Sequence, residues 1–187
     1  GQQPIEALVV RAMRHGIDII YHASFTDEES LDLLEAKKDR VFVAPGIGIL
    51  FAMMDHAAPW GIDRKKAIEM GYEIEIAAAV ESLKKMHKRG IRVLPGGDYG
   101  FAFTPHCDNA RDLEYFVKHL GFTPMEAIVS TTKLGAEIMM LGGELGQIKD
   151  GYLADLLLVD GDPLSNLAIL RDQRKILAVM KDGTFYK

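Results

Sequence analysis

The sequence predicts an α/β fold followed by a short all-β segment. Apolar, β-branched runs of strand length alternate with stretches whose apolar residues recur at helical spacing; these runs are residues 17–22, 41–44 and 91–94. Strands that alternate with helices in this way pair in parallel through crossover connections, in an α/β sheet or barrel. From about Gly143 onward, strand-like runs separated by turns replace the helical patterns. We therefore divide the chain into residues 1–142 and residues 143–187.

The predicted elements are bounded by recognisable start and stop signals. The helices cover residues 4–15, about 26–36, 63–89 with a break at Gly71, 109–120, and a stretch that begins at Thr123. Thr26 precedes Glu29, and Thr123 precedes Glu126, at the spacing of a capping box, which satisfies the first backbone N–H groups of a helix. The Gly- and Met-rich residues 46–62 are predicted to form a loop. The late strands are predicted at 146–148, 154–160 and 176–185.

The composition restricts the classes of partner. The chain has 187 residues and a formal net charge of −5, without a basic stripe, so we expect no nucleic-acid partner. The single cysteine, Cys107, cannot form an internal disulfide or a thiolate metal site by itself. The longest apolar runs are too short to span a bilayer, so we expect no membrane insertion. No signal peptide opens the chain, and we expect a cytoplasmic protein.

Two predicted strands end in potential metal ligands. His22 ends the first strand, and Asp98 follows the third strand after a Pro-Gly-Gly turn. In parallel α/β folds, functional groups gather at the carboxyl ends of the strands. A lone histidine is as often a hydrogen-bonded core residue, and a lone aspartate near glycines is more often a turn residue. Because both lie at the same edge of one sheet, the pattern favours a shared site, which the glycines keep free of side chains.

Other polar side chains follow the same strands. Tyr99 is the next residue after Asp98, and His56 and His106 lie in the segments after the second and third strands. From there they can reach a substrate at the same rim. The remaining histidines each precede a glycine in the last turn of a predicted helix, where an imidazole interacts favourably with the helix dipole and faces water; these are His15, His87 and His119.

The glycines also allow other interpretations. Gly46-Ile-Gly48 begins like a dinucleotide-binding motif, but Phe51 occupies the position of the third glycine, and no helix is predicted to follow directly. Gly96 and Gly97 offer backbone N–H groups to a phosphate, although the carboxylate that follows them would repel that ligand. A phosphate-binding α/β module and a noncatalytic scaffold segment therefore remain alternatives to a metal site.

Four stretches of the sequence resemble the amidohydrolase superfamily. They read GIDIIYHAS, VLPGGDYG, GFTPMEAIVSTTKLGAEIMML and LGQIKDGYLADLLLVDGDPLSNL, and the resemblance extends over nearly the whole chain. Within the superfamily, the sequence is most similar to the imidazolonepropionase-like and prolidase-like members. The Gly-Gly-Asp strand end and the Gly-Gln-Ile-Lys-Asp-Gly run are the most specific parts.

The resemblance implies a fold, a reaction and a set of site residues. The fold is a (β/α)8 TIM-like barrel with one or two divalent metal ions, zinc being expected, and a small β-sandwich to which residues 143–187 contribute. His22 corresponds to a metal ligand at the end of strand six. Asp98 corresponds to a ligand at the end of strand eight that also takes a proton from the attacking water, and His106 corresponds to a substrate contact. The implied reaction is hydrolysis of an amide, peptide or cyclic amide C–N bond in a small molecule.

The sequence also departs from the family pattern. The His-x-His pair of the first barrel strand is absent, as are the lysine of strand four and the histidine of strand five. A closed barrel takes roughly 250 residues, and only three barrel strands are recognised here. We therefore expect the C-terminal portion of a longer enzyme, inactive by itself, whose unpaired strand edges favour association into a homo-oligomer.

Overall fold

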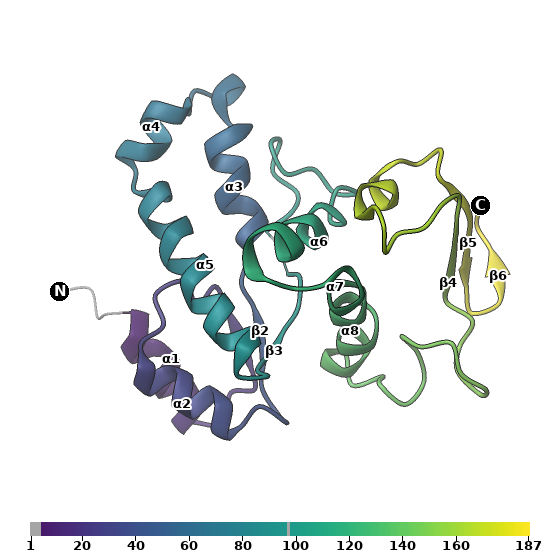
Figure 1. Cartoon of the computed structure of the whole chain (residues 1–187), viewed down its shortest axis with the longest axis horizontal. Coiled ribbons are helices and arrows are strands. Elements are labelled where there is room, and N and C mark those ends of the chain that lie inside the picture. The colour runs from purple at the N-terminus through teal and green to yellow at the C-terminus, as the bar shows by residue number, and fades with distance from the viewer. Residues whose placement is uncertain (1–4, 97) are drawn as a thin grey trace.

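The computed structural model describes residues 5–96 and 98–187, and it contains two separate three-stranded sheets (Figure 1). The first sheet has the order β1-β2-β3 and is parallel throughout; its strands are β1 (Ile19–Tyr21), β2 (Phe42–Ala44) and β3 (Arg92–Val93). Ile20 pairs with Val43, which in turn pairs with Val93. The prediction of parallel strands joined by helical crossovers is confirmed. The first strand is shorter than predicted because the amide of Ile17 still donates to the Ala12 carbonyl at the end of α1.

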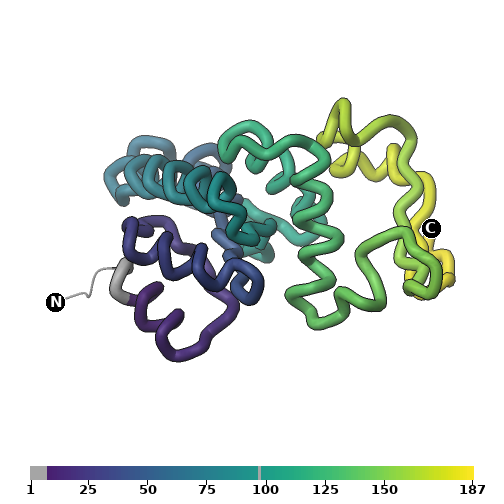
Figure 2. The backbone as a smooth tube through the Cα atoms, turned by 60° about the horizontal axis from the view of Figure 1, so that its bottom comes forward, coloured from purple at the N-terminus to yellow at the C-terminus, as the bar shows by residue number. Residues whose placement is uncertain are grey.

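Helices form most of the layer around this sheet. They are α1 (Ile5–Arg14), α2 (Glu28–Ala36), α3 (Ile47–Asp55), α4 (Arg64–Glu69), α5 (Tyr72–Lys88), α6 (Arg111–Tyr115), α7 (Pro124–Thr131) and α8 (Lys133–Ile138), with short turns η1 (Ala58–Trp60), η2 (Phe116–Leu120) and η3 (Leu167–Arg171). Asp63 caps α4, Gly71 separates α4 from α5, and Thr123 forms the predicted capping box with Glu126. Helices α1 and α2 pack side by side, with α5 next to them (Figure 2).

The predicted start of α2 is wrong by one residue. The N-cap is Asp27, whose carboxylate accepts a hydrogen bond from the amide of Ser30 at 2.8 Å. The Thr26 hydroxyl instead donates to the Ala23 carbonyl, and the Glu29 carboxylate pairs with Arg14 at 3.1 Å. The capping box at Thr26 does not form because both of its side chains have other partners.

The predicted loop over residues 46–62 is also wrong. Helix α3 begins at Ile47, directly after β2, with Gly46 as its N-cap at a φ of 63°. The helix is apolar on nearly every side because it is buried on nearly every side, so its sequence carries no alternation of polar and apolar faces. The expectation that no helix follows Gly46 is corrected accordingly.

The hydrophobic core lies between the parallel sheet and its helices. Strand β2 is buried along its whole length, as expected for a strand with neighbours on both edges and helices on its faces. The largest fully buried apolar side chains are Phe116, Met13, Leu31, Leu34, Ile47, Leu83, Met86, Leu120, Val41, Val43 and Val93. None of the described helices is long and apolar enough to cross a membrane.

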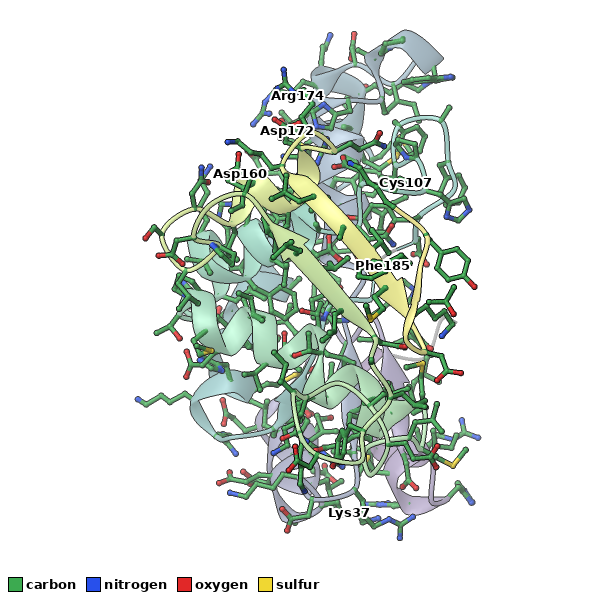
Figure 3. The ribbon with its side chains drawn as sticks, turned by 90° about the vertical axis from the view of Figure 1, so that its right-hand side faces the viewer. Lys37, Cys107, Asp160, Asp172, Arg174 and Phe185 are labelled. Atoms are coloured by element: carbon green, nitrogen blue, oxygen red, sulfur yellow. The ribbon has the colours of Figure 1, made fainter. Side chains whose placement is uncertain are left out.

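The second sheet is antiparallel and closes the chain. Its strands, in the order β4-β5-β6, are β4 (Leu156–Val159), β5 (Ile176–Lys181) and β6 (Thr184–Phe185). Asp182 and Gly183 both have positive φ in the turn between β5 and β6, which is the predicted Asp-Gly turn. Figure 3 shows Phe185 on this sheet, with Asp172 and Arg174 together at one end. The strand predicted at 146–148 does not form; Gly146 has a φ of 86° and packs closely against Thr132 and Ala136.

Besides the contact at Gly146, the two parts of the chain meet at η3. Leu167 is buried in the core of the α/β layer. Arg171 donates to Asp108 at 2.7 Å and to Glu114 of α6 at 2.9 Å. Away from this junction the two parts diverge, and α1 and β6 lie at opposite ends of the molecule (Figure 1). The boundary between residues 1–142 and 143–187 stays a prediction.

Candidate functional site

The structure brings His22 and Asp98 together at the carboxyl ends of the parallel strands. His22 directly follows β1, and Asp98 lies in the segment after β3. The His22 Nε2 and Asp98 Oδ2 atoms are 3.7 Å apart, and both side chains are about half exposed, at 56% and 49%. A ligand approaching from solvent therefore has access to both groups at once.

Gly46, at the end of the central strand, lies beneath this pair. A Cβ atom at this position would be 3.0 Å from His22 Nδ1 and 3.6 Å from Asp98 Oδ2. The backbone amide of Gly46 also donates to the Gly96 carbonyl at 2.7 Å, which holds the second and third strand ends together. The absence of a side chain at Gly46 leaves room for the imidazole beside the carboxylate.

The backbone at His22 has an uncommon conformation. His22 has a φ of 73° and Ala23 a φ of 49°, in the left-handed region that residues with a Cβ rarely adopt. The amide of His22 donates to the Ala44 carbonyl at 3.1 Å, so the turn starts directly at the last ladder bond. Strained backbone of this kind is concentrated at functional sites. The conformation is what places the imidazole next to Asp98.

Gly96, the first of the two glycines before Asp98, has a different role from the one expected. Gly97 lies outside the described residues. A Cβ atom on Gly96 would be 2.7 Å from the Cβ atom of Ala44. Gly96 is therefore required by the close approach of the second and third strand ends, rather than by the space around the His22–Asp98 pair.

Tyr99 is anchored inside the protein. Its hydroxyl donates to Asp112 Oδ1 at 2.8 Å, and Asp112 is buried. Burial raises the pKa of Asp112 to about 6, while the hydrogen bond from Tyr99 acts in the opposite direction. Burial also raises the pKa of Tyr99, with a further contribution from the Asp112 charge. The phenol thus joins the segment after β3 to α6, and Gly48 of α3 lies against both groups. The predicted contact of Tyr99 with substrate stays a prediction.

His106 lies beside the backbone near Asp98. The amide of Gly100 donates to the Thr104 carbonyl at 2.7 Å, and the Thr104 hydroxyl donates to the Asp98 carbonyl at 3.0 Å. The His106 imidazole packs over Gly100, where a Cβ atom would be 2.9 Å from Nε2. His106 is exposed, so it is available to a ligand at this edge.

The other histidines are distributed over the helical layer. His56 ends α3, whose nine residues span about 14 Å, and this length separates it from Gly46. His15 is exposed as predicted. The expectation that His87 and His119 face water is wrong. His87 stacks on Phe122 with a centroid distance of 3.7 Å.

His119 stacks on Phe51 at 4.6 Å and lines a pocket of about 310 Å³ between α3, α5 and η2. Burial lowers its pKa. Sequence position alone missed these contacts because Phe51 is distant in the chain.

The donor set fits part of a metal coordination shell. Zinc binds nitrogen and carboxylate oxygen at about 2.0–2.2 Å, so two donors on one tetrahedral ion lie about 3.4 Å apart. The 3.7 Å between His22 Nε2 and Asp98 Oδ2 is close to that spacing, and Gly46 leaves the space beside them clear. Over residues 5–96 and 98–187, however, no group of three or more His, Cys, Asp or Glu side chains could hold a metal ion. The pair would supply two ligands at most and would not complete a site by itself.

Comparison with known proteins identifies the family. The sequence pattern of the Amidohydrolase family matches residues 75–185, more than half of the chain. The chain belongs to the amidohydrolase family. The resemblance found in the sequence is thereby confirmed.

Individual relatives in the amidohydrolase family extend the match. Ochratoxinase from Aspergillus niger is 24% identical over 198 residues, which cover 97% of this chain and 36% of that protein. Imidazolonepropionase from Rubrobacter xylanophilus is 36% identical over 64 residues, or 34% of this chain and 15% of that protein. The crystal structure of a Xaa-Pro dipeptidase with bound methionine in its active site matches with a TM-score of 0.80 at 27% identity, over 97% of this chain and 43% of that one. The chain thus spans well under half the length of these relatives.

Proposed function

We propose that this chain carries part of the active site of a metal-dependent hydrolase that cleaves an amide, peptide or cyclic amide C–N bond in a small molecule. The observation that supports it most is the His22–Asp98 pair, 3.7 Å apart over Gly46 at the strand ends, in a chain of the amidohydrolase family. A relative named as a Xaa-Pro dipeptidase favours a dipeptide-like substrate.

His22 and Asp98 would hold a divalent ion, with zinc as the expected metal. When bound, such an ion lowers the pKa of water and polarises the scissile carbonyl. The Asp98 carboxylate is the proton acceptor in this proposal: it takes a proton from the attacking water and returns it to the leaving nitrogen. The Thr104 hydroxyl donates to the backbone carbonyl of Asp98, which steadies the segment that carries this carboxylate.

In this proposal, the metal site formed by the 187-residue chain is incomplete. A catalytic zinc generally has about three protein ligands, and this chain supplies His22 and Asp98. In the proposed whole protein, residues 1–142 form the last part of a (β/α)8 barrel, and residues 143–187 form strands of the small β-sandwich. The 187-residue chain by itself is then expected to bind metal weakly and to be inactive.

Titration of this chain with Zn²⁺ tests the ligand assignment. Isothermal titration calorimetry should give weak binding that His22→Ala and Asp98→Ala each weaken at least tenfold, since each substitution removes one of two ligands. His15→Ala is the matched control, because His15 is exposed and its removal should leave binding unchanged. Equal binding by all four proteins would refute the assignment. Substantial metal-dependent turnover by the wild-type chain alone would refute the expected inactivity.

The intact mass of the protein from its source shows how long the natural polypeptide is, and that polypeptide is the one to use in the activity assay. In that polypeptide, Asp98→Asn should abolish hydrolysis of dipeptides and N-acyl amino acids, because an amide cannot accept the proton. The same variant separates the alternative of a phosphate-binding module. A phosphate site would keep or gain affinity for inorganic phosphate once the negative charge is removed.

A further inference from the structure

Three aromatic rings lie together on the segments that follow β2 and β3. Phe101 and Phe103 stack with a centroid distance of 5.6 Å, and Trp60 meets Phe103 edge-on at 6.0 Å. Trp60 is 52% exposed and Phe101 is 53% exposed. We call these residues the aromatic cluster. Rings that stack on one another yet remain half exposed form an ordered apolar surface in contact with solvent.

Hydrogen bonds fasten this cluster to Asp98. The Thr104 amide donates to the Phe101 carbonyl at 3.0 Å, which closes a tight turn that carries both phenylalanines. The Thr104 hydroxyl donates to the Asp98 carbonyl at 3.0 Å. Three residues of extended chain span at most about 11 Å, so Phe101 is within the length of a dipeptide from Asp98.

Trp60 reaches the cluster from the segment that follows the C-terminal end of α3. It lies in η1, which follows α3, and α3 begins at Gly46 beneath the His22–Asp98 pair. The rings thus come from the connections that follow two adjacent parallel strands, β2 and β3. In parallel α/β folds these connections form the walls of the ligand site.

The two segments that carry the cluster contain no charged residue. Residues 57–62 read AAPWGI and residues 99–107 read YGFAFTPHC, without Asp, Glu, Lys or Arg, although 26% of the chain is charged. Small-molecule sites usually combine apolar side chains, which bind the body of the ligand, with a few polar or charged groups, which orient it.

We infer that the aromatic cluster receives an apolar, preferably aromatic, side chain of the amide substrate next to the bond that Asp98 helps to cleave. The inference rests on the proposed function and adds a substrate class to it. A second copy of the chain covering the same rings is the competing occupant. Substrates with a ring in this position should be preferred about tenfold or more over those with glycine, as is usual for an apolar pocket that gains or loses a large group.

The only tryptophan in the sequence, Trp60, reports binding without any turnover. Titration of the full chain with N-acetyl-phenylalanine amide should change the tryptophan emission in a saturable way, and N-acetyl-glycine amide should bind about tenfold more weakly. Phe101→Ala and Phe103→Ala should each remove this preference. Phe101→Leu, which keeps an apolar side chain, should retain part of it. Phe185→Ala is the matched control: Phe185 is also an exposed ring, at 65%, but lies on β6 of the other sheet (Figure 3).

Three outcomes would overturn the inference. These are equal affinity for the two amides, no effect of Phe101→Ala and Phe103→Ala beyond that of Phe185→Ala, or an emission change that depends on protein concentration without ligand. The last result would assign the rings to contact between copies. In the polypeptide that shows turnover, Phe101→Ala should raise KM for phenylalanine amides and leave kcat nearly unchanged. If Asp98→Asn spared turnover while the emission response persisted, the proposed function would fail and the binding site would stand.

Discussion

Replacement of Gly48 by alanine should destabilise the protein, although Gly48 is a helical residue, the second of α3. A glycine in a helix normally costs stability, so Gly→Ala is expected to stabilise by about 0.5–1 kcal/mol. Here the added Cβ atom would overlap Asp112 Oδ1 and would lie 3.1 Å from the Tyr99 hydroxyl oxygen. These two groups are hydrogen-bonded to each other at 2.8 Å and are enclosed by α3 and α6, so they have little freedom to move away.

The magnitude follows from two costs and one gain. Overpacking a close-packed site costs about 1–3 kcal/mol. Loss of the hydrogen bond between Tyr99 and the Asp112 carboxylate adds about 1.5–3 kcal/mol, because the acceptor is charged and buried. The helical preference of alanine offsets about 0.5–1 kcal/mol of this. We therefore expect Gly48→Ala to lower the free energy of unfolding by about 2–5 kcal/mol.

Urea unfolding followed by circular dichroism measures this difference. The matched control is Gly135→Ala in α8, where an added Cβ atom meets nothing within 4 Å and the backbone φ is not positive. That substitution should raise the free energy of unfolding by about 0.5–1 kcal/mol. If Gly48→Ala were as stable as the wild type, or stabilised like Gly135→Ala, the close packing of Gly48 against Asp112 would be refuted.

Two further predictions concern charged groups. The pKa of Asp112 is raised from 3.8 to about 6, so its contribution to stability is fully present below about pH 4 and is lost as the pH rises through about 6. Asp112→Asn keeps an acceptor for Tyr99 and cannot titrate. As the pH rises from 4 to 7, the free energy of unfolding of this variant should therefore increase by up to about 3 kcal/mol relative to that of the wild type. If urea unfolding gave the same difference between the two proteins across this range, the raised pKa of Asp112 would be contradicted. Arg171→Ala should lower stability by about 1–3 kcal/mol and speed proteolysis within residues 143–187, because bonds to two carboxylates of the α/β layer are lost. Arg174→Ala, at a site 90% exposed, should change stability by less than about 0.5 kcal/mol, and equal effects of the two substitutions would exclude a tethering role for Arg171.

Local sequence signals predicted the elements whose cause is local. Asp63 and the Thr123–Glu126 pair cap helices as expected, and Asp182-Gly183 turns the last hairpin. These outcomes depend on a few neighbouring residues, so short motifs contain the needed information. The same kind of motif failed at Thr26, where Arg14 takes the carboxylate that the capping box requires.

The candidate site was predictable in part. His22 and Asp98 follow strands, and the topology of a parallel sheet brings strand ends to one edge, so their proximity could be expected. The role of Gly46 beneath them could not, because it depends on the side chains of the two neighbouring strands. The hydrogen bond of Tyr99 to Asp112 could not be predicted either, because the sequence does not indicate that α6 places Asp112 beside Tyr99.

The sequence by itself determined the alternation of strands and helices, the family, and the placement of His22 and Asp98 after neighbouring strands, because periodicity, caps and strand-end motifs are properties of adjacent residues. Only the tertiary structure decided that residues 47–55 form a buried helix, that Gly96 is needed for the approach of Ala44, and that Trp60 joins the phenylalanines after β3. In each case the deciding contact joins segments far apart in the chain. Its energy depends on packing geometry, which exists only once the sheet and its helices have formed.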